Sequence, residues 1–209
     1  MVWSIGFDDG FLVRQSMTEL DGDIRKIEYV EGPADWNSLG GGFETGKLNL
    51  GRAIKPDHVP TKFEWGGAKN RKLPDAIYGR GMLLVSERIK SIIERIEPGT
   101  HQFFPIDVFY KSNKGLAAKM YFLNICTRLD SVDHDLTTAK MGNTMWRPDL
   151  SGELVFNLDQ IGNHHLWHDK HVYNGRMISD ELHDAMIEQC ISGLVFNKEK
   201  TNVEWQPWR

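Results

Sequence analysis

Residues 81–108 read GMLLVSERIKSIIERIEPGTHQFFPIDV, and this stretch decides the fold. MLLV is a short apolar run of the kind that forms a buried strand, and the Ser86 that follows it is a favoured helix N-cap residue. Pro98 and Gly99 mark the end of a helix, and HQFFPIDVFY has the aromatic and β-branched content of another strand. Between cap and stop, one apolar helix face has the i, i+3, i+4, i+7 spacing: Ile89, Ile92, Ile93 and Ile96.

A second unit of the same kind occurs near the C-terminus. Ser179 follows the apolar run RMI and precedes two acidic residues, which suit the N-terminal end of a helix dipole. The apolar face of this helix is predicted to be Leu182, Ala185, Met186 and Cys190. KMYFLNICT and GELVFNLDQ read as strands between the two units. We therefore predict an α+β fold, in which an antiparallel or mixed sheet carries two serine-capped amphipathic helices packed on one side.

The first 72 residues follow a different pattern. Apolar segments flank Asp8-Asp9-Gly10 and Asp21-Gly22-Asp23, which are tight-turn sequences, so a strand meander is expected there. From residue 31 to residue 74 glycine and proline interrupt every periodic pattern. We predict that residues 1–72 form a strand meander with a Gly/Pro-rich segment, that residues 73–209 form the main α+β region, and that both belong to one compact domain.

Within the glycine-rich segment, GGFETGKL (Gly41–Leu48) has the letters of a phosphate-binding loop. Such a loop needs a buried strand before it, a helix after it and a Ser or Thr that binds magnesium. ADWNSLG is a poor strand, the following segment contains Gly51 and Pro56, and Leu48 stands at the hydroxyl position. We therefore expect no nucleotide site.

Composition and charge limit the classes of function. The chain of 209 residues has a formal net charge of −4, which argues against a general nucleic-acid binder. Residues 128–190 carry five basic and eleven acidic side chains, a net −6 that suits a basic partner. No apolar run has the length of a membrane span, and the acidic N-terminus is unlike a signal peptide, so we expect a cytoplasmic protein without a membrane contact. The two cysteines read as buried free thiols.

A histidine cluster is the strongest metal candidate. NHHLWHDKH contains four histidines, and in a helix His164, His168 and His171 would share one face, as zinc ligands do. Glycine and asparagine on both sides leave only a short segment, however, and Leu166, Trp167, Val172 and Tyr173 fit a strand edge or hairpin better. Two readings stay open: a surface or interface run of histidines, and a metal site.

Acidic and tryptophan side chains are the candidates for partner binding. LDSVDHD contains Asp130, Asp133 and Asp135, which could form a turn, a cation site or an acidic contact surface. The chain has seven tryptophans, and tryptophan is enriched in binding hot spots. We predict partner contacts by Asp130, Asp133, Asp135, Trp146, Trp167, His168, Trp205 and Trp208, and no catalytic residues.

The order of several fragments resembles a bacterial immunity protein family of polymorphic and contact-dependent toxin systems. The fragments are LPDAIYG, the quoted stretch from Gly81, KMYFLNICTRLDSVD, GELVFNLDQ, HHLWHD and MISDELHDAMIEQCISGLVF. They cover about residues 73 to 197. The resemblance implies a small protein that binds and neutralises a cognate toxin encoded by a neighbouring gene, needs no cofactor and is not an enzyme.

The acidic segment would suit a basic toxin such as a nuclease. Two other classes remain open at this point. One is a metal-dependent hydrolase that uses His164, His168 and His171 with Asp130 or Asp133, and the other is a structural or adaptor module of a secretion apparatus. The sequence does not determine the oligomeric state.

Overall fold

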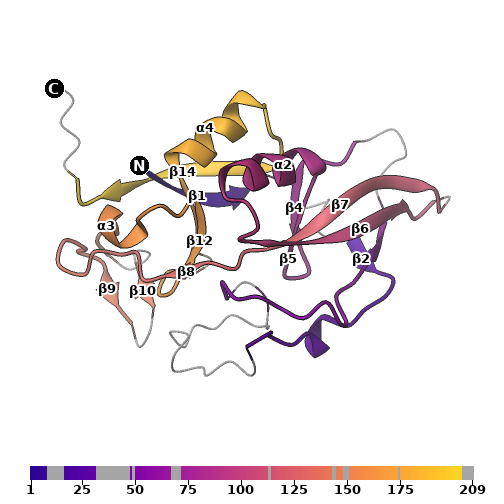
Figure 1. Cartoon of the computed structure of the whole chain (residues 1–209), viewed down its shortest axis with the longest axis horizontal. Coiled ribbons are helices and arrows are strands. Elements are labelled where there is room, and N and C mark those ends of the chain that lie inside the picture. The colour runs from indigo at the N-terminus through magenta and orange to yellow at the C-terminus, as the bar shows by residue number, and fades with distance from the viewer. Residues whose placement is uncertain are drawn as a thin grey trace.

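In the computed structural model, the stretch from Gly81 folds as the expected strand, helix and strand (Figure 1). β5 (Met82–Val85) is buried along its whole length, α2 (Glu87–Ile96) follows it, and β6 (Gln102–Tyr110) comes next. Ile89, Ile92 and Ile93 are buried, so the apolar stripe is the packed face of α2. The structure describes residues 1–8, 17–31, 48, 50–66, 72–112, 114–142, 145–147, 151–173 and 175–203.

One six-stranded sheet, which we name the β1 sheet, combines the two ends of the chain. Its order is β11 (Val155–Phe156), β14 (Leu194–Thr201), β1 (Val2–Phe7), β13 (Arg176–Ser179), β12 (Leu166–Asp169) and β8 (Arg128–Leu129). β1 pairs antiparallel with β13 and β14, whereas β11 pairs parallel with β14 and β8 pairs parallel with β12. The sheet is therefore mixed.

The second six-stranded sheet, named the β6 sheet, contains the long central hairpin. Its order is β2 (Met17–Glu19), β3 (Lys62–Trp65), β6, β7 (Leu116–Asn124), β5 and β4 (Ala76–Gly79). β3 and β6 run parallel, and the other pairs are antiparallel. A separate small hairpin joins β9 (Lys140–Met141) to β10 (Trp146–Arg147). The predicted α+β class with a mixed sheet is confirmed, and more residues lie in strands than in helices.

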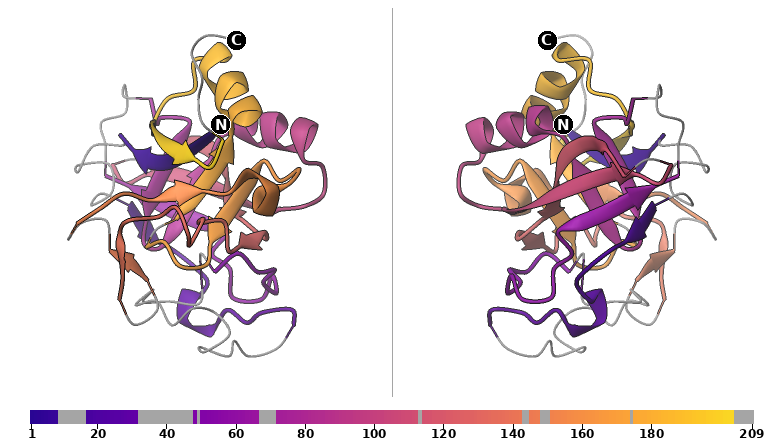
Figure 2. Two further views of the ribbon diagram at one scale, coloured as in Figure 1. Left: turned by 90° about the vertical axis from the view of Figure 1, so that its left-hand side faces the viewer. Right: turned by 90° about the vertical axis from the view of Figure 1, so that its right-hand side faces the viewer.

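The helices lie where the two sheets meet. α2 and α4 (Asp180–Glu188) are side by side on the same side of the molecule, as both views in Figure 2 show. Their buried faces share one apolar cluster with Val85 and Leu123 of the β6 sheet and with Ile5 and Ile178 of the β1 sheet. Shorter helical segments are the 3-10 turn η1 (Ile24–Lys26) and α3 (Leu158–Ile161). The helix pair thus belongs to both sheets and fixes them to each other.

The two predicted serine caps differ. Ser179 accepts a hydrogen bond from the Leu182 amide at 3.2 Å, as an N-cap should. Ser86 occupies the cap position of α2 but makes no such bond, and its hydroxyl donates instead to the Asp75 carboxylate at 2.8 Å. The prediction of two serine-capped helices is therefore not confirmed as stated.

α4 ends earlier than the apolar pattern suggests. It stops at Glu188, and Cys190 has a left-handed backbone with φ 50° and is exposed. The expectation that both cysteines are buried is wrong for Cys190, because that residue lies beyond the packed face. Cys126 is half-buried, and burial raises the pKa of its thiol to about 11. Both thiols are free.

The N-terminal strand is an integral part of the β1 sheet. β1 lies between β13 and β14, and residues 2–7 pair with residues 194–199. The predicted division of the chain at residue 72 stays a prediction. The turn at Asp9-Gly10, the strand after it and the phosphate-loop sequence from Gly41 to Lys47 lie outside the described residues. Leu48, the residue at the hydroxyl position of that motif, is 5% exposed and packs in the core.

Candidate functional site

The Asp130 carboxylate is the centre of a surface cluster. It follows β8 directly, is exposed, and has a histidine on each oxygen. His134 Nε2 lies 3.2 Å from Oδ1, and His171 Nε2 lies 3.5 Å from Oδ2. The His134 ring in turn meets the Trp146 ring edge-on, with centroids 5.2 Å apart. Residues from three separate segments therefore converge on one carboxylate.

Asp133 shapes the turn that carries this cluster. Its Oδ1 accepts hydrogen bonds from the amides of Asp135 at 3.1 Å and Leu136 at 3.0 Å. Its Oδ2 accepts from Asn157 Nδ2 at 3.0 Å, which ties the turn to the start of α3. Aspartate often stabilises a turn through such bonds to the backbone two or three residues on. The turn reading of LDSVDHD is thus correct, and Asp135 and Leu136 are placed on the outside of the molecule.

Exposed apolar side chains stand in the segments that meet at the acidic turn. Leu136 is 52% exposed, Met141 in β9 is 39% exposed and Tyr173 is 60% exposed. Met141 pairs with Trp146 in the hairpin, and the Trp146 amide donates to the His171 carbonyl at 2.8 Å, so hairpin and acidic turn are contiguous. We name this region the Asp130 surface, which consists of Asp130, Asp133, Asp135, Leu136, Met141 and Tyr173.

Three of the residues predicted as partner contacts lie inside the fold. Trp167 is 0% exposed, His168 1% and Trp146 7%. The Trp167 indole donates to Ser131 Oγ at 3.0 Å, and the Ser131 hydroxyl donates to the buried Asp169 at 2.6 Å. All four residues of β12 are buried because the strand is covered on both faces. The sequence signal for this burial was the pair of adjacent apolar residues Leu166 and Trp167, whose side chains point to opposite faces of the strand.

Of the other predicted contacts, the three aspartates lie at or near the surface, and the two C-terminal tryptophans lie outside the described residues. Asp130 and Asp135 are exposed and Asp133 is half-buried, so the structure brings the acidic trio together at the Asp130 surface. Trp205 and Trp208 lie outside the described residues. Their role in partner binding remains a prediction, as does that of the acidic residues.

The three histidines proposed as zinc ligands occupy separate environments. Residues 166–169 form a strand rather than a helix, so the shared helical face does not exist. His164 lies 3.4 Å from Glu97, His168 is enclosed between the strands, and His171 contacts Asp130. The hairpin-like reading of this segment is the correct one.

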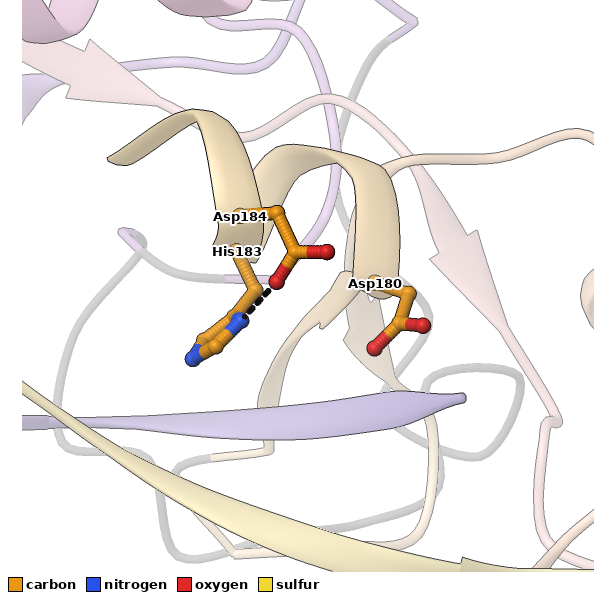
Figure 3. A group of neighbouring side chains, drawn as sticks. All are labelled: Asp180, His183 and Asp184. Carbon is orange, nitrogen blue, oxygen red and sulfur yellow. Dashed lines mark hydrogen bonds and ion pairs between the residues drawn. The ribbon is translucent and has the colours of Figure 1, made fainter. Parts of the chain in front are cut away.

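In the part of the chain that the structure describes, only one group of three side chains has metal-ligand spacing. Asp180, His183 and Asp184 place one ligand atom each within 4.8 Å of the others (Figure 3). His183 Nδ1 bonds Asp184 at 2.8 Å, and Asp180 accepts a hydrogen bond from the Trp3 indole at 2.9 Å. Asp180 stands in the first turn of α4, where a carboxylate complements the positive end of the helix dipole, and Asp184 is paired with His183. The helix dipole and hydrogen bonds within the fold therefore account for this group.

His168 makes the stability of the fold depend on pH. Burial, followed by the nearby Arg176, Arg128 and His101, holds the pKa of His168 well below its ordinary value of 6.5. The unfolded chain therefore takes up a proton at this residue before the folded chain does. The stability contributed by neutral His168 is complete above pH 6.5 and is lost as the pH falls below that value.

We expect the free energy of unfolding in denaturant to fall by roughly 1 kcal/mol between pH 6.5 and 5.5, because the unfolded chain binds up to about one more proton than the folded chain in this range. His168→Gln, which cannot titrate, should remove this slope. His58→Asn is the matched control, since His58 is exposed and its φ of 68° is tolerated by asparagine. A slope that persists in His168→Gln would show that another group is responsible.

Comparison with known proteins identifies the family. The sequence model of the immunity protein family (Imm11) matches residues 28–201, which is most of the chain. The match begins well before the fragments that suggested the resemblance and contains the whole Asp130 surface. No curated protein sequence matches the chain at a significant level. None of the helices among the described residues has the length and apolarity to cross a membrane. The chain belongs to the Imm11 immunity protein family, and this membership indicates a role in immunity to a toxin.

Proposed function

We propose that the chain binds the toxin encoded by a neighbouring gene, that it blocks this toxin without any chemistry of its own, and that the Asp130 surface is the docking face. The observation that carries the proposal is that exposed apolar and acidic side chains stand in the segments that converge on Asp130. Protein interfaces of high affinity have an apolar or aromatic centre and a polar rim. Leu136, Met141 and Tyr173 can supply the centre, and Asp130 and Asp135 the rim.

The occupant that fits this surface is a basic toxin domain. The surface carries the carboxylates of Asp130, Asp133 and Asp135 within a segment, residues 128–190, whose net charge is −6, and complementary charge speeds encounter and rejects wrong partners. A nuclease has a basic substrate surface because it must attract phosphates. An inhibitor that covers such a surface with carboxylates occupies the place of the nucleic acid. We therefore propose a nuclease as the toxin.

The competing functions have less support in the geometry. The hydrolase hypothesis depended on one shared face for His164, His168 and His171, and these side chains contact different parts of the fold. An adaptor of a secretion apparatus would bind a partner but would not protect a cell from it. Binding and protection therefore need to be measured separately.

The experiment is co-expression with the product of the neighbouring gene. That product alone should stop growth, and the chain should restore growth and form a one-to-one complex with a Kd in the nanomolar range, as is usual for stable inhibitory complexes. Glu188→Lys, a charge reversal at an exposed position near the end of α4, should protect as well as the unmodified chain. A neighbouring product that is not toxic, or a complex that forms without restoring growth, would contradict the proposal.

A further inference from the structure

Three basic side chains form a row across the β1 sheet. His168 of β12 is the register partner of Arg176 in β13 on one side and of Arg128 in β8 on the other. Residues that face each other on neighbouring strands project from the same side of a sheet. Arg176 is 2% exposed and His168 is 1% exposed. The Arg176 guanidinium lies 4.4 Å from the centre of the Tyr78 ring, so the row faces β4 of the other sheet.

Each member of the row has at least one buried side-chain nitrogen without a hydrogen-bond partner among the described residues, and Arg176 has two. In the described part of the chain, Nε and Nη2 of Arg176 and Nε2 of His168 have no hydrogen-bond partner. Arg128 also has one such atom, Nε, but its Nη1 and Nη2 donate to the carbonyls of Leu50 at 2.9 Å and Lys170 at 3.2 Å. Buried polar groups are nearly always paired, and each exception in a folded protein calls for a specific explanation.

The two unused donors of Arg176 form a matched pair. Nε and Nη2 lie on the same edge of the guanidinium and point in parallel, which is the geometry that holds two oxygens of one anion. Arg25 uses this same edge for the Asp23 carboxylate, with Nε to Oδ1 at 3.1 Å and Nη2 to Oδ2 at 3.3 Å. The guanidinium edge that binds a carboxylate in Arg25 is thus buried in Arg176 and has no acceptor from the described part of the protein.

The surroundings of the row are cationic. The charged groups that act on His168 are Arg176, Arg128 and His101, all of them basic, and of these His101 contacts an acid, Glu97, at 3.3 Å. Arg176 forms no ion pair with any acidic side chain in the described residues. The aromatic rings that its guanidinium contacts, those of Tyr78 and Phe7, carry no formal charge. A buried guanidinium is strongly unfavourable unless an anion compensates it.

We propose that Arg176 and His168 form a binding site for a small oxyanion, which the parallel donors of Arg176 hold through two oxygens and which His168 Nε2 contacts when it carries the proton. The donors have no accessible surface, so an anion reaches them only when neighbouring side chains move, and this favours a free small anion over the side chain of another protein. Phosphate and a small carboxylate such as acetate share the required pair of oxygens.

The test is the thermal stability of the full chain in phosphate, sulfate or acetate, each at ionic strength held constant with chloride. We expect a saturable rise in Tm, roughly 5 to 10 °C at about 100 times the Kd, with at least one of these anions. Comparison of phosphate and sulfate with acetate identifies the class of oxyanion. If the Tm of the unmodified chain is the same in all these anions as in chloride at equal ionic strength, the proposed site does not exist.

Variants locate the effect. Arg176→Met keeps the apolar stem of the side chain without its donors, and it should abolish the anion-dependent rise. Arg25→Met removes an exposed arginine that already has its carboxylate, and it should leave the rise unchanged. Arg176→Lys keeps the charge without the paired donors and should weaken the apparent affinity at least tenfold, which tests the same donors if the methionine variant does not fold. A full rise in either Arg176 variant would contradict the assignment.

Discussion

Leu136→Lys should weaken binding of the cognate toxin about 100-fold or more. Leu136 is 52% exposed at the tip of the acidic turn, where Asp133 fixes its backbone amide. The substitution removes an apolar side chain from the centre of the proposed interface and places a cation against a basic partner. Loss of a central contact costs about 2 kcal/mol or more, and like-charge juxtaposition adds to this penalty. Calorimetric titration of the purified toxin measures the change.

Ile187 offers a closely matched control. It is also an exposed aliphatic residue, 55% accessible, but it lies on α4 away from the acidic turn. Ile187→Lys makes the same chemical change at nearly the same exposure, but outside the proposed interface. It should therefore leave the Kd of toxin binding unchanged. Both variants should unfold at the temperature of the unmodified chain, because neither side chain is buried. Equal losses of affinity in the two variants would mean that the toxin does not dock on the Asp130 surface.

The elements that the sequence predicted well are those determined by neighbouring residues. The isoleucine spacing in α2 and the Pro98-Gly99 stop after it are local signals, and the helix begins and ends accordingly. The same holds for the turn at Asp133, whose carboxylate bonds to amides two and three residues away. By contrast, the pairing of β1 with β13 and β14 joins residues nearly a whole chain length apart, and no local pattern specifies it.

The candidate site could be predicted only in part for a related reason. Acidic residues close together in sequence stay close in space, so the acidic trio was visible from the order of residues. Leu136, Met141 and Tyr173 were not identified, since their exposure depends on which segments pack together. Trp167 and Trp146 show the converse, because the enrichment of tryptophan at interfaces does not distinguish an exposed ring from one in the core. His168 acquires its unusual environment only from strand pairing.

Glu97 connects the end of α2 to the start of β12. One carboxylate oxygen accepts hydrogen bonds from the amides of His165 at 3.2 Å and Leu166 at 3.0 Å, and it lies 3.3 Å from His101 Nε2. The other oxygen lies 3.4 Å from His164 Nδ1. Burial alone would raise the pKa of Glu97, but the hydrogen bonds from His101, His164 and the His165 amide outweigh it and lower the pKa. A single carboxylate therefore holds together a helix end and a strand of the β1 sheet.

Glu97→Ala should lower the free energy of unfolding by about 3 kcal/mol, because it leaves two amides and the buried His101 without their acceptor. Glu94→Ala, one turn earlier on α2, is the control: Glu94 is half-buried and has no hydrogen bond or ion pair within the described residues, so we expect a change below about 0.5 kcal/mol. Denaturant unfolding near neutral pH measures both.

The contribution of Glu97 should also depend on pH. Since the folded pKa of Glu97 is lowered, its stabilisation is complete above the ordinary value of 4.5 and is lost as the pH falls through the folded pKa. The difference between the unmodified chain and Glu97→Ala should accordingly narrow in acid, and a difference that is constant across this range would show that packing, rather than the carboxylate, makes the contribution.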